Sequence, residues 1–202
     1  MNRNILITGS NRGIGLALSQ HYLNLGDTVY AVCRKASKEL VTLKGIHIIE
    51  GIDVTQDNDL FILKESLGTI KLDILINNAG IMSEEILGDI DFLAIEHQFK
   101  VNAIGPLKTT EFLLDHLSAG AKVALVSTRM GSISDNGSGG FYGYRMSKTA
   151  LNSAGKTLAQ DLKPKGISVA MLHPGFVQTD LVNNAGDVSP AQAAKGLVQR
   201  IE

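Results

Sequence analysis

The stretch YGYRMSK, residues 142–148, places two tyrosines and one lysine within seven residues. A phenol beside an ammonium group can act as a proton donor and acceptor, because the positive charge favours the phenolate and lowers the tyrosine pKa. Residues four apart on an α-helix share a face, as Tyr144 and Lys148 would. Tyr142 is six residues from Lys148, about 240° around the helix, so it is expected at the loop end, packing or lining a cleft. The spacing favours Tyr144 as the proton donor, although the same pair also fits ordinary helix surface.

The sequence TGSNRGIG puts Gly9, Gly13 and Gly15 between a strand-like run and a helix-like run. Missing side chains let a phosphate approach the backbone N–H groups, and the helix N-terminus adds a partial positive charge. The spacing G-x-x-x-G-x-G differs from the common dinucleotide pattern, and it lacks the Gly-Lys-Ser/Thr ending of a kinase or GTPase loop. A plain tight turn would use the same glycines, so this motif alone leaves the ligand open.

The second predicted strand ends in AVCRK, with Arg34 and Lys35 and no acidic residue. Proteins that bind NAD usually carry an Asp or Glu there, which accepts hydrogen bonds from the ribose 2′-hydroxyl. A guanidinium suits a 2′-phosphate instead, and Arg12 adds a second one inside the glycine turn. The alternative is that both arginines are solvated surface cations. We expect NADP(H) as the cofactor.

Short apolar runs alternate with longer amphipathic ones along the chain. Strands that are apolar throughout are typical of a parallel sheet buried on both faces. The pattern predicts an α/β fold, a Rossmann-type doubly wound parallel sheet with helices on both faces, as a single domain over 1–202. The predicted strands are 4–8, 28–34, 45–54, 72–80, 121–127 and 166–175. The predicted helices are 14–26, 56–68 capped by Thr55, about 85–100, about 103–118, 143–163, and a last one that begins at Ser189-Pro190.

Composition excludes several classes of function. The 202 residues are 44% apolar and 19% charged, with a net charge of −1, so nucleic acid is not expected as a partner. No apolar run approaches the length of a membrane span. Five scattered histidines and the lone Cys33 predict no metal site and no internal disulfide. The N-terminus lacks a signal pattern, which predicts a cytoplasmic protein.

Five motifs stand in one order along the chain: TGSNRGIG, NNAG at 77–80, Asn102 in VNAIG, Y-x-x-x-K at 144–148 and PGFVQTD at 174–180. In this order they resemble the short-chain dehydrogenases/reductases over nearly the whole chain. The stretch from Ser127 to Lys148 is similar to that of the bacterial C-factor-like carbonyl reductases. The resemblance implies hydride transfer between NADP(H) and a small-molecule carbonyl, and a homodimer or homotetramer.

The resemblance also implies roles for individual residues. Tyr144 would exchange the proton with the substrate oxygen, and Lys148 would tune Tyr144 and bind the nicotinamide ribose. Asn102 would hold a water molecule in a proton relay. Asn77 is expected to stabilise the sheet as well. The implied cofactor-binding residues are Gly9, Ser10, Asn11, Arg12, Gly13, Ile14, Gly15, Arg34, Asp53, Val54, Asn77, Ala79, Gly80, Tyr144, Lys148, Pro174, Gly175, Val177 and Thr179.

The catalytic hydroxyl departs from the family pattern. Relatives usually carry it on the second Ser of a pair that ends the fifth strand, where this chain has Ser127-Thr128. A threonine can donate the same hydrogen bond, although its methyl group restricts the rotamer. We expect Thr128 to act here, with Ser127 and Ser132 as the alternatives.

The C-terminal part also departs from the family pattern. Relatives usually continue past the last helix into a further strand, whereas this chain ends at Glu202, so the last strand is expected to be missing. The segment 180–189, which would cover the substrate, is short. Two other functions fit the same fold: a nucleotide-binding signalling or regulatory protein, and an epimerase or dehydratase. Epimerases and dehydratases tend to have a larger C-terminal substrate region.

Overall fold

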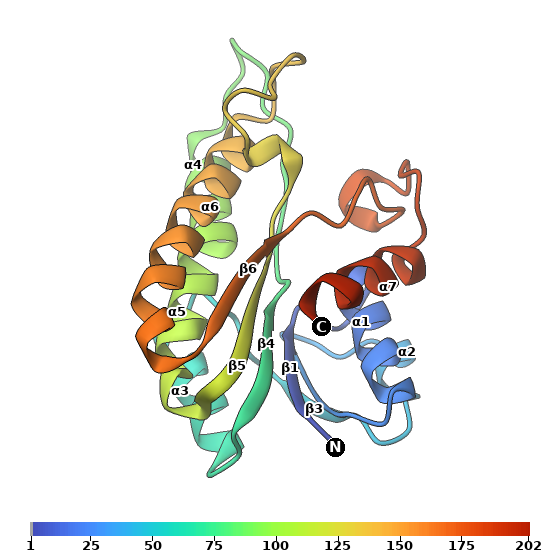
Figure 1. The fold of residues 1–202 in the computed structure, drawn as a ribbon. Coiled ribbons are helices and arrows are strands. Elements are labelled where there is room, and N and C mark those ends of the chain that lie inside the picture. Colours follow the sequence, from blue (N-terminus) through green and yellow to red (C-terminus); the bar gives the residue numbers. More distant parts are fainter. Residues whose placement is uncertain (1) are drawn as a thin grey trace.

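A computed structural model describes residues 2–202, and its strands form one six-stranded sheet in the order β3-β2-β1-β4-β5-β6 (Figure 1). Every neighbouring pair of strands is parallel. This confirms the predicted doubly wound α/β fold. The strands are β1 (Asn4–Thr8), β2 (Thr28–Cys33), β3 (His47–Glu50), β4 (Leu72–Asn77), β5 (Leu117–Val126) and β6 (Ser168–Leu172).

Helices cover both faces of the sheet, with α3, α4, α5 and α6 on one side and α1, α2 and α7 on the other (Figure 1). The helices are α1 (Gly13–Asn24), α2 (Lys38–Val41), α3 (Asp57–Leu67), α4 (Phe92–Phe99), α5 (Gly105–Phe112), α6 (Tyr142–Leu162) and α7 (Pro190–Ile201). Ser189 begins α7 with a capping box, as the sequence predicted. In the part of the chain that the structure describes, no helix combines the length and the apolar character needed to cross a membrane.

Successive strand residues point to opposite faces, and both faces are apolar, so two cores form. On β1, Leu6 packs with the buried leucines of α3 and α6. Its neighbours Ile5 and Ile7 pack on the other face, with residues of α1 and α7. Strand β5 repeats this alternation, which explains why the strands read as continuous apolar runs.

Four local expectations differ from the structure. The helix predicted over about 103–118 is shorter, because α5 ends at Phe112 and β5 already begins at Leu117. Residues 85–91 are not helical, and α4 begins only after Asp91, whose side chain accepts from the Ala94 N–H at 3.1 Å. The predicted break at Asn102 is instead a π-helical segment, η1 (Lys100–Ile104), which joins α4 to α5. The N-cap of α3 is Gln56 rather than Thr55, because the Thr55 hydroxyl donates to Asp53 Oδ1 at 2.8 Å.

Strands β1 and β4 lie side by side in the middle of the sheet, and the connections that follow them cover opposite faces. In open α/β sheets, ligands bind beyond the carboxyl ends of the strands at such a switch point. The fold therefore directs attention to the loops that follow these two strands.

Candidate active site

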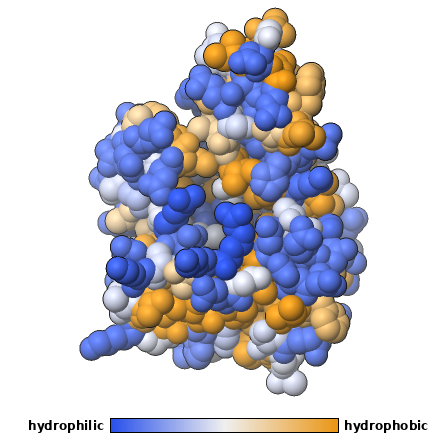
Figure 2. Space-filling view, turned by 180° about the vertical axis from the view of Figure 1, so that it is seen from behind, coloured by the Kyte–Doolittle hydropathy of each residue, from blue (hydrophilic) through white to orange (hydrophobic). Residues whose placement is uncertain are grey.

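A cleft of about 1670 Å³ opens at the carboxyl ends of the strands. Seen from behind, the molecule is hollowed near its middle, and strongly hydrophilic side chains edge the hollow (Figure 2). All predicted cofactor-binding residues line the cleft except Ser10, Gly15 and Asn77. These three residues are buried and do not face the open space of the cleft.

Ser10 and Gly15 shape the glycine-rich turn from inside. The Ser10 hydroxyl donates to the Ile7 carbonyl at 2.6 Å, which closes the turn after β1. A Cβ at Gly15 would lie only 2.2 Å from the Gly9 carbonyl oxygen, so no larger residue fits there. Gly9 has a φ of 69°, a left-handed conformation that favours glycine. At Gly9 and Gly15 the turn therefore leaves no room for a side chain.

Asn78 was missed by the sequence analysis, although it lies within the NNAG motif. Its Nδ2 donates to the carbonyls of Thr8 and Gly9 at 3.0 and 3.2 Å, which ties the loop after β4 to the glycine turn. The preceding Asn77 side chain lies elsewhere and donates to the Thr110 hydroxyl at 3.2 Å. Neighbouring asparagines thus serve different purposes, Asn78 in the cleft wall and Asn77 between β4 and α5.

The two arginines expected at the cofactor phosphates have different surroundings. Arg34 is exposed on the cleft at the end of β2, and among residues 2–202 it has no carboxylate within salt-bridge distance. Arg12 instead forms an exposed salt bridge with Asp180 at 3.0 Å. Within residues 2–202, Arg12 is therefore paired with a carboxylate and Arg34 is not.

The segment after β6 lies across the glycine turn. A Cβ at Gly13 would come within 3.1 Å of the Thr179 methyl carbon, so the two loops are in close contact there. Val177 and Val188 form an isolated bridge, and the Gln178 N–H donates to the Val188 carbonyl at 2.9 Å. This pairing holds Val177 and Thr179, two of the predicted cofactor-binding residues, in one short, ordered loop.

Tyr144 and Lys148 lie together on α6 and face the cleft, with only 9% and 5% of each residue exposed. The Lys148 ammonium is 5.9 Å from the centre of the Tyr144 ring and donates to the Val126 carbonyl at 2.8 Å. Tyr142 is the first residue of α6, is half-buried, and does not line the cleft. Tyr144 and Lys148 therefore share one face of α6, as their i, i+4 spacing predicted.

Burial governs the protonation of this pair. Burial raises the pKa of Tyr144 to about 12, and a hydrogen bond with the Thr128 side chain opposes that rise. Burial lowers the pKa of Lys148 to about 8. The direction for Tyr144 is opposite to the one expected from the sequence, because removing the phenolate from water outweighs the opposing effect of Thr128. Tyr144 is therefore protonated at neutral pH, which is the form that can donate a proton.

Thr128 is the hydroxyl residue nearest to this chemistry. Its side chain lowers the pKa of Tyr144 and accepts from the Met130 N–H at 3.2 Å, at the start of the 3₁₀ turn η3 (Arg129–Gly131). Ser127 also lines the cleft, but its hydroxyl donates to Asn152 Oδ1 at 2.6 Å. Ser132 lies outside the cleft lining and bonds with Ser134. Of the three candidates, Thr128 alone both lines the cleft and affects the pKa of Tyr144.

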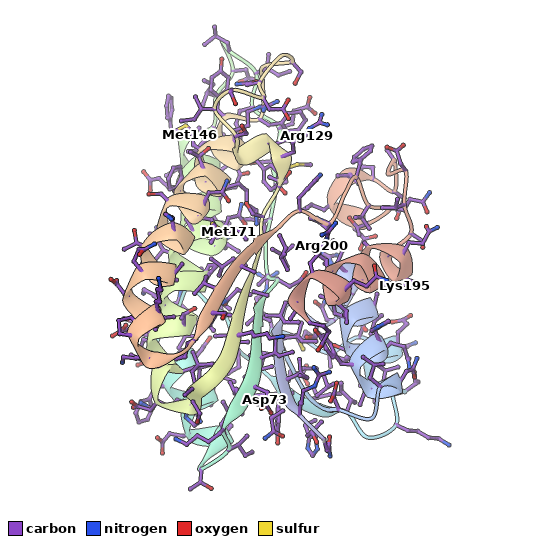
Figure 3. All side chains as sticks on the ribbon, viewed as in Figure 1. Asp73, Arg129, Met146, Met171, Lys195 and Arg200 are labelled. Carbon is purple, nitrogen blue, oxygen red and sulfur yellow. The ribbon has the colours of Figure 1, made fainter. Side chains whose placement is uncertain are left out.

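The 3₁₀ turn η3 carries a cation close to the cleft, Arg129. Arg129 lies on the lobe above the sheet, across from Arg200 on α7 (Figure 3). Its Nε lies 2.8 Å from the Asp135 carboxylate. Arg129 and Asp135 both line the cleft, so its outer part is polar and has charges of both signs.

Asn102 lies in η1 and is fully buried. Its Oδ1 accepts from the Ile81 N–H at 2.9 Å, and its Nδ2 donates to the Ile81 carbonyl and to the Ser147 hydroxyl, at 2.8 and 3.0 Å. The side chain thus joins the loop after β4 to α6 beside Lys148. Pro106 has no N–H, so the regular α-helical bond from residue 106 to the Asn102 carbonyl cannot form.

Gly80 lets the loop after β4 pack closely against Asn102 and Lys148. A Cβ at Gly80 would come within 3.3 Å of Asn102 Oδ1 and 3.7 Å of Lys148 Nζ. The four residues expected to be catalytic are therefore packed into one cluster, although Asn102 stands behind the cleft wall. Within residues 2–202, no three His, Cys, Asp or Glu side chains gather closely enough to hold a metal ion.

Comparisons with known proteins agree with this geometry. The family model of the short chain dehydrogenases matches residues 3–189. The 1-hydroxy-2-glutathionyl-2-methyl-3-butene dehydrogenase of Rhodococcus sp. (strain AD45) is 38% identical over 98% of this chain and 90% of its own length. The C-signal protein of Myxococcus xanthus is 42% identical over 65% of this chain and 81% of its own.

A solved structure supports the same assignment. The NADPH-bound carbonyl reductase from chicken fatty liver matches with a TM-score of 0.88 at 28% identity, over 99% of this chain and 91% of that one. The predicted resemblance to C-factor-like carbonyl reductases is confirmed. The parallel sheet, the glycine turn, the ordered motifs and these relatives lead to one conclusion: this chain belongs to the short chain dehydrogenase family.

Proposed function

We propose that this chain is an NADP(H)-dependent oxidoreductase that reduces a small-molecule carbonyl compound or, in reverse, oxidises the alcohol. The observation that carries the proposal is that Thr128, Tyr144 and the buried Lys148 ammonium lie together at the cleft, with Thr128 near enough to Tyr144 to lower the pKa of its phenol. Two hydroxyls at one point of a cleft can both bond to a carbonyl oxygen. The family assignment supports hydride transfer as the accompanying chemistry.

The cleft suits a phosphorylated dinucleotide. The glycine turn presents backbone N–H groups at the start of α1, and Arg34 stands at the end of β2 where a 2′-phosphate would lie. The NADPH-bound carbonyl reductase structure supports the same cofactor. When bound, the nicotinamide supplies or accepts the hydride. Val177 and Thr179 would orient it from the loop after β6.

The other steps of the reaction are carried out by side chains of this protein. Thr128 donates a hydrogen bond to the substrate oxygen and orients it. Tyr144, which is protonated at neutral pH, gives its proton to that oxygen as negative charge develops there. The Lys148 ammonium stabilises the phenolate left behind, and Asn102 holds the helices that position the pair. Protons would return from solvent through a relay that begins at Lys148.

The test is oxidation of NADPH by the purified protein with a panel of aldehydes, ketones and quinones. Because the Rhodococcus relative is named for an alcohol that bears a glutathionyl group, glutathione conjugates belong in the panel. We expect Tyr144→Phe to lower kcat by about 10²–10⁴-fold. Tyr142→Phe, the same change on another face of the helix, is the matched control and should leave kcat within about twofold. A fully active Tyr144→Phe variant would refute the mechanism.

The likeness to C-signal favours one alternative, a nucleotide-binding signalling protein in which turnover is incidental. The intact set of Tyr144, Lys148 and Asn102 argues against it. Tight NADPH binding without turnover of any carbonyl, together with an unchanged cellular phenotype in a Tyr144→Phe strain, would support this second function instead.

A further inference from the structure

The helix that carries Tyr144 begins without a cap of its own. Its N-cap residue is Phe141, whose side chain makes no capping hydrogen bond. Phe141 also has a left-handed conformation, with φ of 53° and ψ of 43°, which is strained for a bulky residue. The first N–H groups of a helix have no partner within the helix and need acceptors from elsewhere. The first turn of α6 therefore depends on groups outside its own sequence.

Glu85 supplies those acceptors from 58 residues away. Its carboxylate Oε2 accepts from the Gly143 N–H at 3.0 Å, which is the second helical position of α6. Its backbone carbonyl accepts from the Phe141 N–H at 3.2 Å. A carboxylate at this place also interacts favourably with the positive end of the helix dipole. One residue thus holds both the strained start of α6 and its first turn.

The other carboxylate oxygen of Glu85 is held equally firmly. Oε1 accepts from the Ser83 hydroxyl and from Gln98 Nε2, each at 2.6 Å. Gln98 Oε1 in turn accepts from the Ser83 N–H at 3.2 Å. Glu85 is 1% exposed, and no Lys, Arg or His of residues 2–202 lies within salt-bridge distance of it. The buried charge is stabilised by hydrogen bonds and the helix end rather than by a cation.

Gly143 explains why this network can reach the helix. A Cβ there would lie 2.3 Å from Gln98 Nε2 and 3.1 Å from the Ile95 Cα. Only a glycine lets α4 approach α6 so closely, and Tyr144 is the next residue. The network of Ser83, Glu85 and Gln98 therefore joins the loop after β4, α4 and the first turn of α6.

We propose that Glu85 is a positioning residue for the reaction, which acts as a distal N-cap of α6. Its carboxylate fixes the first turn of the helix and thereby positions the Tyr144 side chain at the cleft. Glu85 does not line the cleft, so we expect it to act only through Tyr144. This inference rests on the proposed catalytic function of Tyr144. A displacement of about 1 Å in a reacting group can lower a rate by about 10²-fold.

The experiment compares Glu85→Ala and Glu85→Gln with the wild-type protein, and Glu111→Ala, an exposed acid on α5, serves as the control for charge. Steady-state kinetics give kcat and the KM for NADPH, and fluorescence titration gives the Kd of NADPH. Amide hydrogen exchange reports on the first turn of α6 independently of activity. Glu85→Gln keeps an acceptor for the Gly143 N–H but turns an NH₂ group toward Ser83 and Gln98, so its effect should be intermediate.

We expect Glu85→Ala to lower kcat by about 10–100-fold while the Kd of NADPH stays within about twofold. Exchange of the Gly143 amide should become faster, and Glu85→Gln should recover part of kcat. If Glu85→Ala does not fold, Glu85→Gln carries the test and should show a smaller loss of kcat with the Kd of NADPH unchanged.

The proposal is overturned by a kcat within about twofold of wild type in Glu85→Ala, or by equal losses of kcat and NADPH affinity that Glu85→Gln does not relieve. Tyr144→Phe is measured in parallel. If Tyr144→Phe is inactive and Glu85→Ala is fully active, only the role of Glu85 fails. If Tyr144→Phe is itself active, the proposed function fails.

Discussion

Replacing Lys148 by methionine should abolish carbonyl reduction and yet stabilise the fold at neutral pH. Lys148 is 5% exposed, and its ammonium has one hydrogen-bond acceptor, the Val126 carbonyl at 2.8 Å. Burial lowers its pKa from 10.5 to about 8, which means that folding disfavours the charged form. Methionine has a similar length and no charge, so it fits the site without that penalty.

The size of the expected stabilisation follows from the lowered pKa of Lys148. A pKa lowered from 10.5 to about 8 corresponds to a penalty of about 3 kcal/mol on the folded state with a charged lysine. The substitution also leaves the Val126 carbonyl without its donor, which costs about 1–3 kcal/mol. The expected net gain in the free energy of unfolding at pH 7 is therefore about 1 kcal/mol.

The pH dependence separates this effect from repacking. Between about pH 8 and 10.5 the unfolded chain keeps a proton on Lys148 that the folded chain has lost, so the free energy of unfolding rises with pH. The wild-type protein should gain up to about 3 kcal/mol from this residue across that window, and the variant should not. The raised pKa of Tyr144 acts in the opposite sense above about pH 10, but it is common to both proteins and cancels in the difference.

Urea unfolding followed by circular dichroism at pH 7, 8, 9 and 10 measures this difference. Lys165→Met, on an exposed lysine just after α6, is the matched control and should show no such pH-dependent crossover. We expect Lys148→Met to be more stable than wild type at pH 7 and less stable at pH 10. A difference that is constant over this range, or a variant that is already less stable at pH 7, would refute the reasoning.

Three further predictions follow from the site. Thr128→Val should lower kcat by about 10²–10³-fold, because it removes a donor to the developing charge, whereas Thr128→Ser should retain most activity; comparable rates in both variants would contradict the role of the hydroxyl. Arg34→Ala should weaken NADPH binding by about 10–100-fold and leave NADH binding unchanged, as measured by fluorescence titration. Asp180→Asn should change NADPH binding by less than about threefold, because the salt bridge between Asp180 and Arg12 is exposed. Gly15→Ala should lower the thermal midpoint by about 4 °C or more, since its Cβ would meet the Gly9 carbonyl at 2.2 Å; an unchanged midpoint would show that the turn can shift.

Much of the fold and of the site could be predicted because the signals are local. Apolar strands of β-branched residues, the glycine turn and the spacing of Tyr144 and Lys148 each lie within a few residues of one another. The miss at residues 85–91 has a physical reason. That segment has the apolar periodicity of a helix, but Glu85 is drawn into a buried network with α4 and α6, and the helix begins only where Asp91 caps it.

The sequence by itself determined the parallel α/β fold, the family motifs and which tyrosine pairs with the lysine, because backbone geometry converts short spacings directly into shared faces. Only the tertiary structure decided that Thr128 meets Tyr144, that Arg12 is paired with Asp180 while Arg34 is not, and that Glu85 caps α6. It also reversed the expected direction of the Tyr144 pKa. These properties depend on burial and on contacts between residues far apart in the chain, which the spacing of residues in a sequence does not contain.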